Sequence, residues 1–184
     1  MDALMESLRT ACQFALCLAC LLPWDGPLAA QLLHPAPSEY QVKAAFLLNF
    51  TRFIEWPASA FPQPDAPFQI CIAGDDPFGG VIDQIVEGEK VGDRRLAVRR
   101  TRDGAAGECH LMFATRGREG PVPLPPRPGM LVVGDSPDIL REGGMIAFVI
   151  ADRRVRFDIN LRAAQSAGLR ISSKLLSVAR NVEK

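Results

Sequence analysis

The stretch Phe68-Gln-Ile-Cys-Ile-Ala-Gly-Asp-Asp76 decides the class of fold. In an extended chain, a phenylalanine and two isoleucines alternate along one face here, while Cys71 and Ala73 occupy the other face. A short run that is apolar on both faces is typical of an interior strand in a sheet that is covered on both sides. Gly74 and Pro77 then predict the end of this strand and the start of a helix.

Outward from this strand, the hydrophobic pattern changes between strand-like and helix-like periods. Ser38 and Gln41 form the pattern of a capping box, which predicts a helix with Lys43 at the edge of its apolar stripe. The proline-rich segment 117–129 predicts an irregular loop. We expect strands at 68–73, 94–100, 108–114, 130–133, 145–151 and 155–159. We expect helices at 38–56, 76–88 and 172–182, with shorter helical segments after 136 and 160.

This order of elements predicts an α/β fold. The expected architecture is a single-domain layered sandwich, with a mixed sheet of about six strands and helices on both faces. The strands beginning at Phe68, Cys109 and Met130 are expected to run parallel. A tight turn at 152–153 joins the last two strands, so at least one pair must be antiparallel.

Residues 1–30 have the pattern of a secretory signal peptide. Arg9 precedes an apolar run at 11–22, which is about as long as a signal-peptide core and shorter than the ~20 residues of a membrane-spanning helix. Leu28-Ala29-Ala30 is a candidate cleavage site, and a lipoprotein start at Cys20 is the alternative. We therefore expect a signal peptide at 1–30, a linker at 31–37 and one exported, soluble domain at 38–184.

Export would leave two of the five cysteines, Cys71 and Cys109, in an oxidising compartment. A disulfide between them would close a loop of about 40 residues and stabilise the fold by about 4 kcal/mol. The alternative is a pair of small buried thiols in neighbouring strands. The two cysteines do not form a C-x-x-C pair, so neither a catalytic redox pair nor a zinc site is expected.

Composition and charge narrow the class of partner. Hydrophobic residues make up 48 % and charged residues 23 % of the chain, as in ordinary globular proteins. The formal net charge is zero, and removal of residues 1–30 leaves 20 basic and 18 acidic residues. Neither nucleic acid nor an anionic membrane surface is therefore expected as the main partner.

Two strands end in Gly-Asp before a helix begins, at Gly74-Asp75 and Gly134-Asp135. Open α/β sheets usually place ligands at such strand ends. The phosphate-loop and dinucleotide-binding patterns are both missing, so no nucleotide cofactor is expected. The aspartates could gather a cation, but Asp at a helix start is more often a cap, and no metal site is assigned.

No residues in the sequence assemble a recognisable active site. His110, beside Cys109, is expected to be structural because no G-x-S-x-G elbow accompanies it. Asp158 lies between Arg154 and Arg156 on one strand face and lacks a second carboxylate at a fixed spacing, so a local salt bridge is expected. The sequence therefore predicts that the protein is not an enzyme.

Several segments resemble the YfiR family, in the same order along the chain. The longest is Tyr-Gln-Val-Lys-Ala-Ala-Phe-Leu-Leu-Asn-Phe-Thr-Arg-Phe-Ile-Glu-Trp-Pro at 40–57, followed by the Phe68 stretch through Gly79. The others lie at 109–110, 132–137, 143–148, 155–161 and 168–176. Together they cover nearly all of the chain after residue 37, so the protein is identified as a member of this family.

The resemblance implies a small periplasmic α/β domain with a regulatory role. The named member of the family restrains an inner-membrane diguanylate cyclase by binding its periplasmic domain, and an OmpA-like outer-membrane lipoprotein relieves this restraint. By resemblance, we expect a non-enzymatic periplasmic regulator that lowers cyclic-di-GMP and so affects biofilm formation and motility. A cyclase, an OmpA-like lipoprotein and a second copy of the chain are the partners to consider.

The resemblance also implies roles for particular residues, and the chain departs from the family pattern in places. Cys71 and Cys109 stand at the positions of the family's central disulfide. The named member has a second cysteine pair near 143–144, which this chain lacks. The segment after Ala114 is short and proline-rich where many relatives have a helix, and Asp158 stands where relatives often have glutamate.

Two classes of function remain open at this point. A protein-binding regulator would use the exposed members of the strand at 156–160, with Arg156, Asp158 and Asn160, together with the C-terminal helices. A small-ligand sensor or delivery protein would use a pocket near Asp75 and Asp135.

Overall fold

The computed structural model describes residues 36–101, 107–117, 120–121, 124 and 127–184. Contacts divide the chain into Met1–Ala36 and Pro37–Lys184, and the second unit contains every described helix and strand. The predicted signal peptide and most of the predicted linker lie outside the described residues. None of the described helices is long and apolar enough to cross a membrane.

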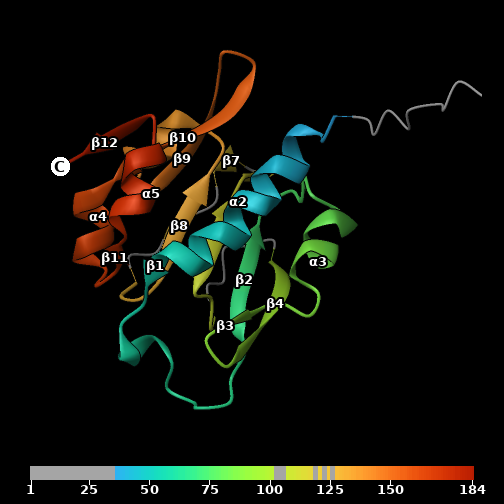
Figure 1. The fold of residues 1–184 in the computed structure, drawn as a ribbon, viewed down its shortest axis with the longest axis vertical. Coiled ribbons are helices and arrows are strands. Elements are labelled where there is room, and N and C mark those ends of the chain that lie inside the picture. The colour runs from blue at the N-terminus through green and yellow to red at the C-terminus, as the bar shows by residue number, and fades with distance from the viewer. Residues whose placement is uncertain (1–35, 102–106, 118–119, 122–123, 125–126) are drawn as a thin grey trace, which may run out of the picture. The chain divides into compact units, whose positions relative to one another are not determined.

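A mixed sheet of eight strands forms the centre of the domain, in the order β12-β10-β9-β8-β5-β2-β4-β3 (Figure 1). The strands are β2 (Phe68–Ala73), β3 (Lys90–Val91), β4 (Arg94–Thr101), β5 (Leu111–Ala114), β8 (Leu131–Gly134), β9 (Ile146–Ala151), β10 (Arg154–Asn160) and β12 (Asn181–Glu183). Neighbours from β4 through β2, β5 and β8 to β9 run parallel. The α/β class and the mixed sheet are confirmed, and the strand count is higher than predicted.

The two additional strands lie at the two edges of the sheet. β3 pairs antiparallel with β4, and β12 pairs parallel with β10. Each has only two or three residues, which is too short to show a period of two. The helix predicted at 172–182 is correspondingly shorter, because α5 (Ser173–Val178) ends and the chain turns back to form β12.

Two further strand pairs lie outside this sheet. β1 (Ile54–Glu55) pairs antiparallel with β11 (Arg170–Ile171), and β6 (Arg116–Gly117) pairs with β7 (Gly120–Pro121). The first pair explains why α2 (Glu39–Phe53) ends three residues before the predicted position: Ile54 is already extended and joins a strand. The predicted capping box is present, since the side chains of Ser38 and Gln41 accept from each other's backbone N–H groups.

The described α-helices are α2, α3 (Gly80–Val86), α4 (Leu161–Ser166) and α5, and all four pack on one face of the sheet. Their buried residues, such as Leu47, Ile82 and Leu175, join one core cluster with alternate side chains of the central strands. Figure 1 shows α2 crossing this face. In the part of the chain that the structure describes, the predicted helices on both faces are therefore reduced to α-helices on one face and the short 3-10 helix η3 on the other.

A second core cluster covers the other face of the sheet. Its buried members are Cys71, Ala73, Cys109, Met112, Ala114, Met130, Val132, Ile139 and Ala147. Ile139 comes from the short 3-10 helix η3 (Pro137–Leu140), and the rest come from strands or extended segments. Hydrophobic periodicity shows that a helix has a buried side but not which face of the sheet that side meets, so the one-sided cover could not be predicted.

The structure joins Cys71 and Cys109 in a disulfide on this second face, with Cα atoms 5.8 Å apart. The bond ties β2 to the segment that leads into β5, across a sequence separation of 38 residues. Arg99 of β4 lies over the bridge, with Nη2 3.3 Å from Cys109 Sγ and 3.8 Å from Cys71 Sγ. The sequence pattern gave no indication of this contact.

Replacing both cysteines, as Cys71→Ala with Cys109→Ala, should lower the free energy of unfolding by about 4 kcal/mol, because the open chain gains conformational entropy when unfolded. Urea unfolding of the oxidised wild-type protein and the double variant measures this difference. A reductant should weaken the wild type and leave the variant unchanged. A difference below about 1 kcal/mol would contradict a stabilising role for the bridge.

Candidate functional site

The carboxyl ends of β2, β5 and β8 lie at the same end of the sheet, where the sequence predicted a ligand site. The Thr115 hydroxyl donates to the carbonyl oxygens of Ala73 (3.1 Å) and Asp75 (2.7 Å). The Gly74 N–H donates to the carbonyl of Thr101 at 3.1 Å. At this end of the sheet, backbone groups therefore form hydrogen bonds within the fold. The Asp75 side chain is exposed and makes no ion pair with the described residues.

Asp135, at the end of β8, is held by α2. Its Oδ2 accepts from the Tyr40 hydroxyl at 3.1 Å and lies 3.5 Å from Nζ of Lys43. Lys43 is only 4 % exposed, so the prediction that it lies at the edge of the helix is wrong. Its ammonium also lies 2.5 Å from Glu39 and 4.7 Å from the centre of the Tyr40 ring. Burial, followed by the Asp135 charge, raises the pKa of Tyr40 to about 12.

These contacts indicate a packed ionic cluster between α2 and β8, in which the buried charge has the carboxylate partners that burial demands. Gly134 also has a packing role, because a Cβ atom there would overlap Ile139. No described contact joins Asp75 to Asp135. The described residues also contain no group of three or more histidine, cysteine or acidic side chains that could hold a metal ion.

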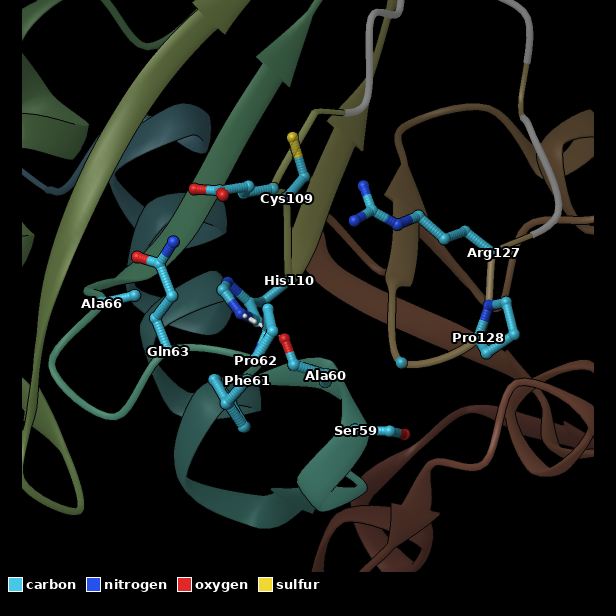
Figure 2. Close-up of a pocket in the computed structure, with 12 residues that line it drawn as sticks. Ser59, Ala60, Phe61, Pro62, Gln63, Ala66, Cys109, His110, Arg127 and Pro128 are labelled. Atoms are coloured by element: carbon cyan, nitrogen blue, oxygen red, sulfur yellow. Dashed lines mark hydrogen bonds between the residues drawn. The ribbon is translucent and has the colours of Figure 1, made fainter.

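A pocket of about 190 Å³ lies at the opposite end of the parallel strands, where they begin (Figure 2). The loop before β2 contributes Phe61 and Gln63, and the segment before β5 contributes Glu108 and His110. Arg127 comes from the segment before β8, across the pocket from Cys109 in Figure 2. The sequence had placed a ligand pocket near Asp75 and Asp135, and this pocket is at the other end of the strands.

His110 lines the pocket, and both of its ring nitrogens are hydrogen-bonded. Nδ1 accepts from the backbone N–H of Gln69 at 3.0 Å, so Nε2 carries the proton and donates to the carbonyl of Ala60 at 3.0 Å. The ring stacks between Phe61 and Phe68, at 4.6 and 5.0 Å between ring centres. Burial lowers the pKa of His110 below its usual 6.5, so the imidazole is neutral. Its two hydrogen bonds tie the loop at Ala60 to the start of β2 at Gln69.

On β10, the three residues that were predicted to form a contact surface differ in exposure and in their partners. Asp158 is 6 % exposed and accepts two hydrogen bonds from Arg180, one of them 2.8 Å from Nε. Its partner is therefore not the predicted neighbour, Arg154 or Arg156. Asn160 caps α4, accepting from the backbone of Ala163 at 2.9 Å.

Arg156 alone of the three is exposed. The Asp158 pairing could not be found from sequence because Arg180 follows 22 residues later, beyond any fixed spacing. Arg180 and Arg162, which donates to the carbonyl of Lys184 at 3.0 Å, together hold the end of the chain against β10.

Lowering the pH should weaken the fold through His110. The unfolded chain binds a proton at this side chain near pH 6.5, whereas the folded chain binds it only at lower pH, so the stability present above pH 6.5 is lost as the pH falls. The loss is at most about 1.4 kcal/mol per pH unit. His110→Asn, which keeps an acceptor but does not titrate, should lose less stability between pH 7 and pH 5 in urea unfolding. Equal losses in both proteins would contradict this role.

Arg180→Ala should destabilise the domain more than the double change Asp158→Ala with Arg180→Ala. The single variant leaves a buried carboxylate without its partner, whereas the double variant removes the charge as well. Thermal unfolding of the two variants provides the comparison. A single variant that melts at or above the temperature of the double variant would show that Asp158 does not need Arg180.

Comparison with known proteins places the fold in a family. The family model described as YfiR/HmsC-like matches residues 40–180. This range runs from the first turn of α2 to Arg180 and includes the disulfide, the pocket and the Asp158 pair. None of the curated proteins that were compared matches the chain. Because the family match covers well over half of the sequence, the chain belongs to the YfiR/HmsC-like family.

Proposed function

We propose that this protein is a periplasmic, non-enzymatic regulator that binds the periplasmic sensor domain of an inner-membrane diguanylate cyclase. Binding restrains the cyclase and so lowers cyclic-di-GMP. The observation that carries the proposal is the YfiR/HmsC-like match over residues 40–180. An OmpA-like outer-membrane lipoprotein is the proposed second partner, which would relieve the restraint by binding the regulator in turn.

One structural feature and one sequence pattern support the periplasmic part of this proposal. The disulfide between Cys71 and Cys109 suits an oxidising compartment, because such bonds rarely persist in a reducing cytoplasm. The predicted signal peptide at 1–30 would deliver the domain there. Cleavage after residue 30 and a free, soluble mature form are part of the proposal.

Three polar side chains form hydrogen bonds or ion pairs within the fold, and this favours a binding protein over an enzyme. Both nitrogens of His110 are used within the fold, and the carboxylates of Asp135 and Asp158 are held by basic side chains. General acid–base catalysis needs a group that can reach a substrate proton. His110 and Asp158, which the sequence analysis considered for catalysis, are instead engaged in contacts within the fold.

The proposed contact surface for the cyclase is the exposed part of the β9–β10 hairpin with the nearby end of α5. Arg156 is exposed there and makes no ion pair within the described residues. Ile150 and Val178 are each 56 % exposed, which is unusual for large apolar side chains in a domain with a well-formed core. Ile150 is opposite Val155 and faces the helix side of the sheet, whereas Arg156 is opposite Val149 and faces the disulfide side, so the proposed contact takes in both faces of the hairpin. Arginine and exposed apolar side chains are each typical of protein-binding surfaces.

A small-ligand sensor is the alternative function, and the pocket beside His110 favours it. Its lining combines the Phe61 ring with polar groups from Gln63, Glu108 and Arg127, which is the mixture that ligand sites use. A ligand retained through purification and seen by native mass spectrometry would support this alternative.

Deleting the gene in the native host should raise intracellular cyclic-di-GMP, because the cyclase loses its restraint. Complementation with the full-length gene should restore the low level, while a form lacking residues 1–30 should not, since it stays in the cytoplasm. Cyclic-di-GMP is measured by mass spectrometry of cell extracts. No change on deletion, in cells shown to contain the protein, would refute the regulatory role.

A charge reversal tests the surface within the same experiment. Arg156→Glu should fail to restore the low level of cyclic-di-GMP. Glu87→Lys is the matched control, because Glu87 is exposed, makes no described ion pair and lies at the end of α3, across the sheet from β10. Full repression by Arg156→Glu would show that the cyclase does not bind this hairpin.

A further inference from the structure

The outer side of β4 is only partly covered. β4 has eight residues, but β3 pairs with just two of them, Arg94 and Arg95. β3 is the last strand in the order of the sheet, so no described strand continues along the rest of β4. Figure 1 shows β3 and β4 at the edge opposite β12.

Two hydrogen bonds fix which backbone groups of β4 face outward. The Leu96 N–H donates to the carbonyl of Glu89 at 3.1 Å, away from β2, and the Thr101 carbonyl accepts from Gly74 at 3.1 Å, on the β2 side. Since successive residues of a strand point their backbone groups to opposite sides, those of Val98 and Arg100 also face away from β2. Neither residue has an outward backbone hydrogen bond within the described chain.

The side chains along this edge are strongly basic on the disulfide face of the sheet. Arg99 lies over the disulfide, and Arg95, four residues before it, points to the same face. Lys90 of β3 is directly opposite Arg95 in the register. Neither Lys90 nor Arg95 has an ion pair or side-chain hydrogen bond within the described residues. Like charges opposite each other destabilise a strand pair, and no described carboxylate offsets them.

The other face of the edge is different. Val98 is partly buried and packs against the helix-side cluster. Arg100 is already engaged, with Nε 2.7 Å from Asp76 and Nη2 2.6 Å from Asp83. On one face, a strand added here would therefore lie near Arg95 and Lys90, which have no described ion-pair partner. On the other face, it would meet an apolar side chain next to a neutralised arginine.

We propose that the open edge of β4 binds an extended, acidic segment of a partner protein as an added strand. Its backbone would pair with Val98 and Arg100. A carboxylate would lie diagonal to Arg95, beyond the end of β3, with an apolar side chain opposite Val98. The binding segment thus alternates acidic and apolar residues. A second copy of this chain does not fit, because pairing two such edges would bring arginines together. The inference holds whichever protein carries the segment.

The probe is an acetylated, amidated and fluorescently labelled peptide of about seven residues in which glutamate alternates with valine and threonine. It is mixed with the protein purified in its exported form, and binding is followed by fluorescence anisotropy. Backbone amide exchange by NMR locates the contact. In the free protein, the amides of Val98 and Arg100 should exchange rapidly, and bound peptide should protect them. A peptide with lysine in place of glutamate should not bind.

Two variants test the backbone and the charge separately. Val98→Pro removes an outward N–H that the fold does not use, and edge strands tolerate proline at such positions, so the protein should fold but lose binding. Arg95→Glu should weaken binding about tenfold, because attraction becomes repulsion. Lys174→Glu makes the same charge change on α5, whose chain leads into β12 at the other edge of the sheet, and should leave the affinity unchanged, because Lys174 is exposed and makes no described ion pair.

Several outcomes would overturn the proposal. One is equal binding of the acidic and basic peptides, and another is binding that survives Val98→Pro in a folded protein. Slow amide exchange at Val98 and Arg100 in the free protein would show that the edge is already closed. A dimer of the wild type that Val98→Pro dissociates would assign the edge to a second copy instead. Absence of binding at millimolar peptide would likewise reject the acidic segment.

Discussion

The domain depends on burying β2 on both of its faces. Phe68, Ile70 and Ile72 join the helix-side cluster, while Cys71 and Ala73 join the cluster on the other face. A strand in this position needs cover from both sides, because its neighbours in the sheet satisfy its backbone but not its side chains. The helix side is covered by α2 and α3. The other side has no described α-helix, and there the disulfide, η3 and extended segments supply the cover.

Short elements cover the second face of the sheet, and their close packing explains the roles of several residues there. η3 lies so close to β8 and β9 that Gly134 and Gly144 leave no space for a Cβ atom beside Ile139. The disulfide brings the chain before β5 against β2, where a helix would otherwise provide apolar area. The Gly-Asp ends of β2 and β8 look like ligand sites in the sequence, yet Gly134 serves packing and Asp135 binds Tyr40 and Lys43.

Local patterns were sufficient for much of the fold. The Ser38 capping box and the apolar faces of β2 placed their elements correctly, as did the turn at Asp152-Arg153, whose φ angles of 51° and 59° give a tight hairpin. What sequence could not supply depended on distant partners. Lys43 is buried because Asp135 lies beside it, and Asp158 is buried because Arg180 returns to it. Strands as short as β3 and β12 carry no period to detect.

The position of the disulfide has a consequence for the integrity of the chain. Cys71 and Cys109 enclose α3, β3 and β4 within one covalently closed loop. A protease that cut the backbone once between residues 72 and 108 would therefore leave the two fragments joined by the sulfur bridge. β4 lies within this closed loop. The strand could therefore leave the sheet and pair with it again while the disulfide holds the two ends of the loop together. The bridge thus turns a single break in the backbone into a nick that leaves the two fragments covalently attached.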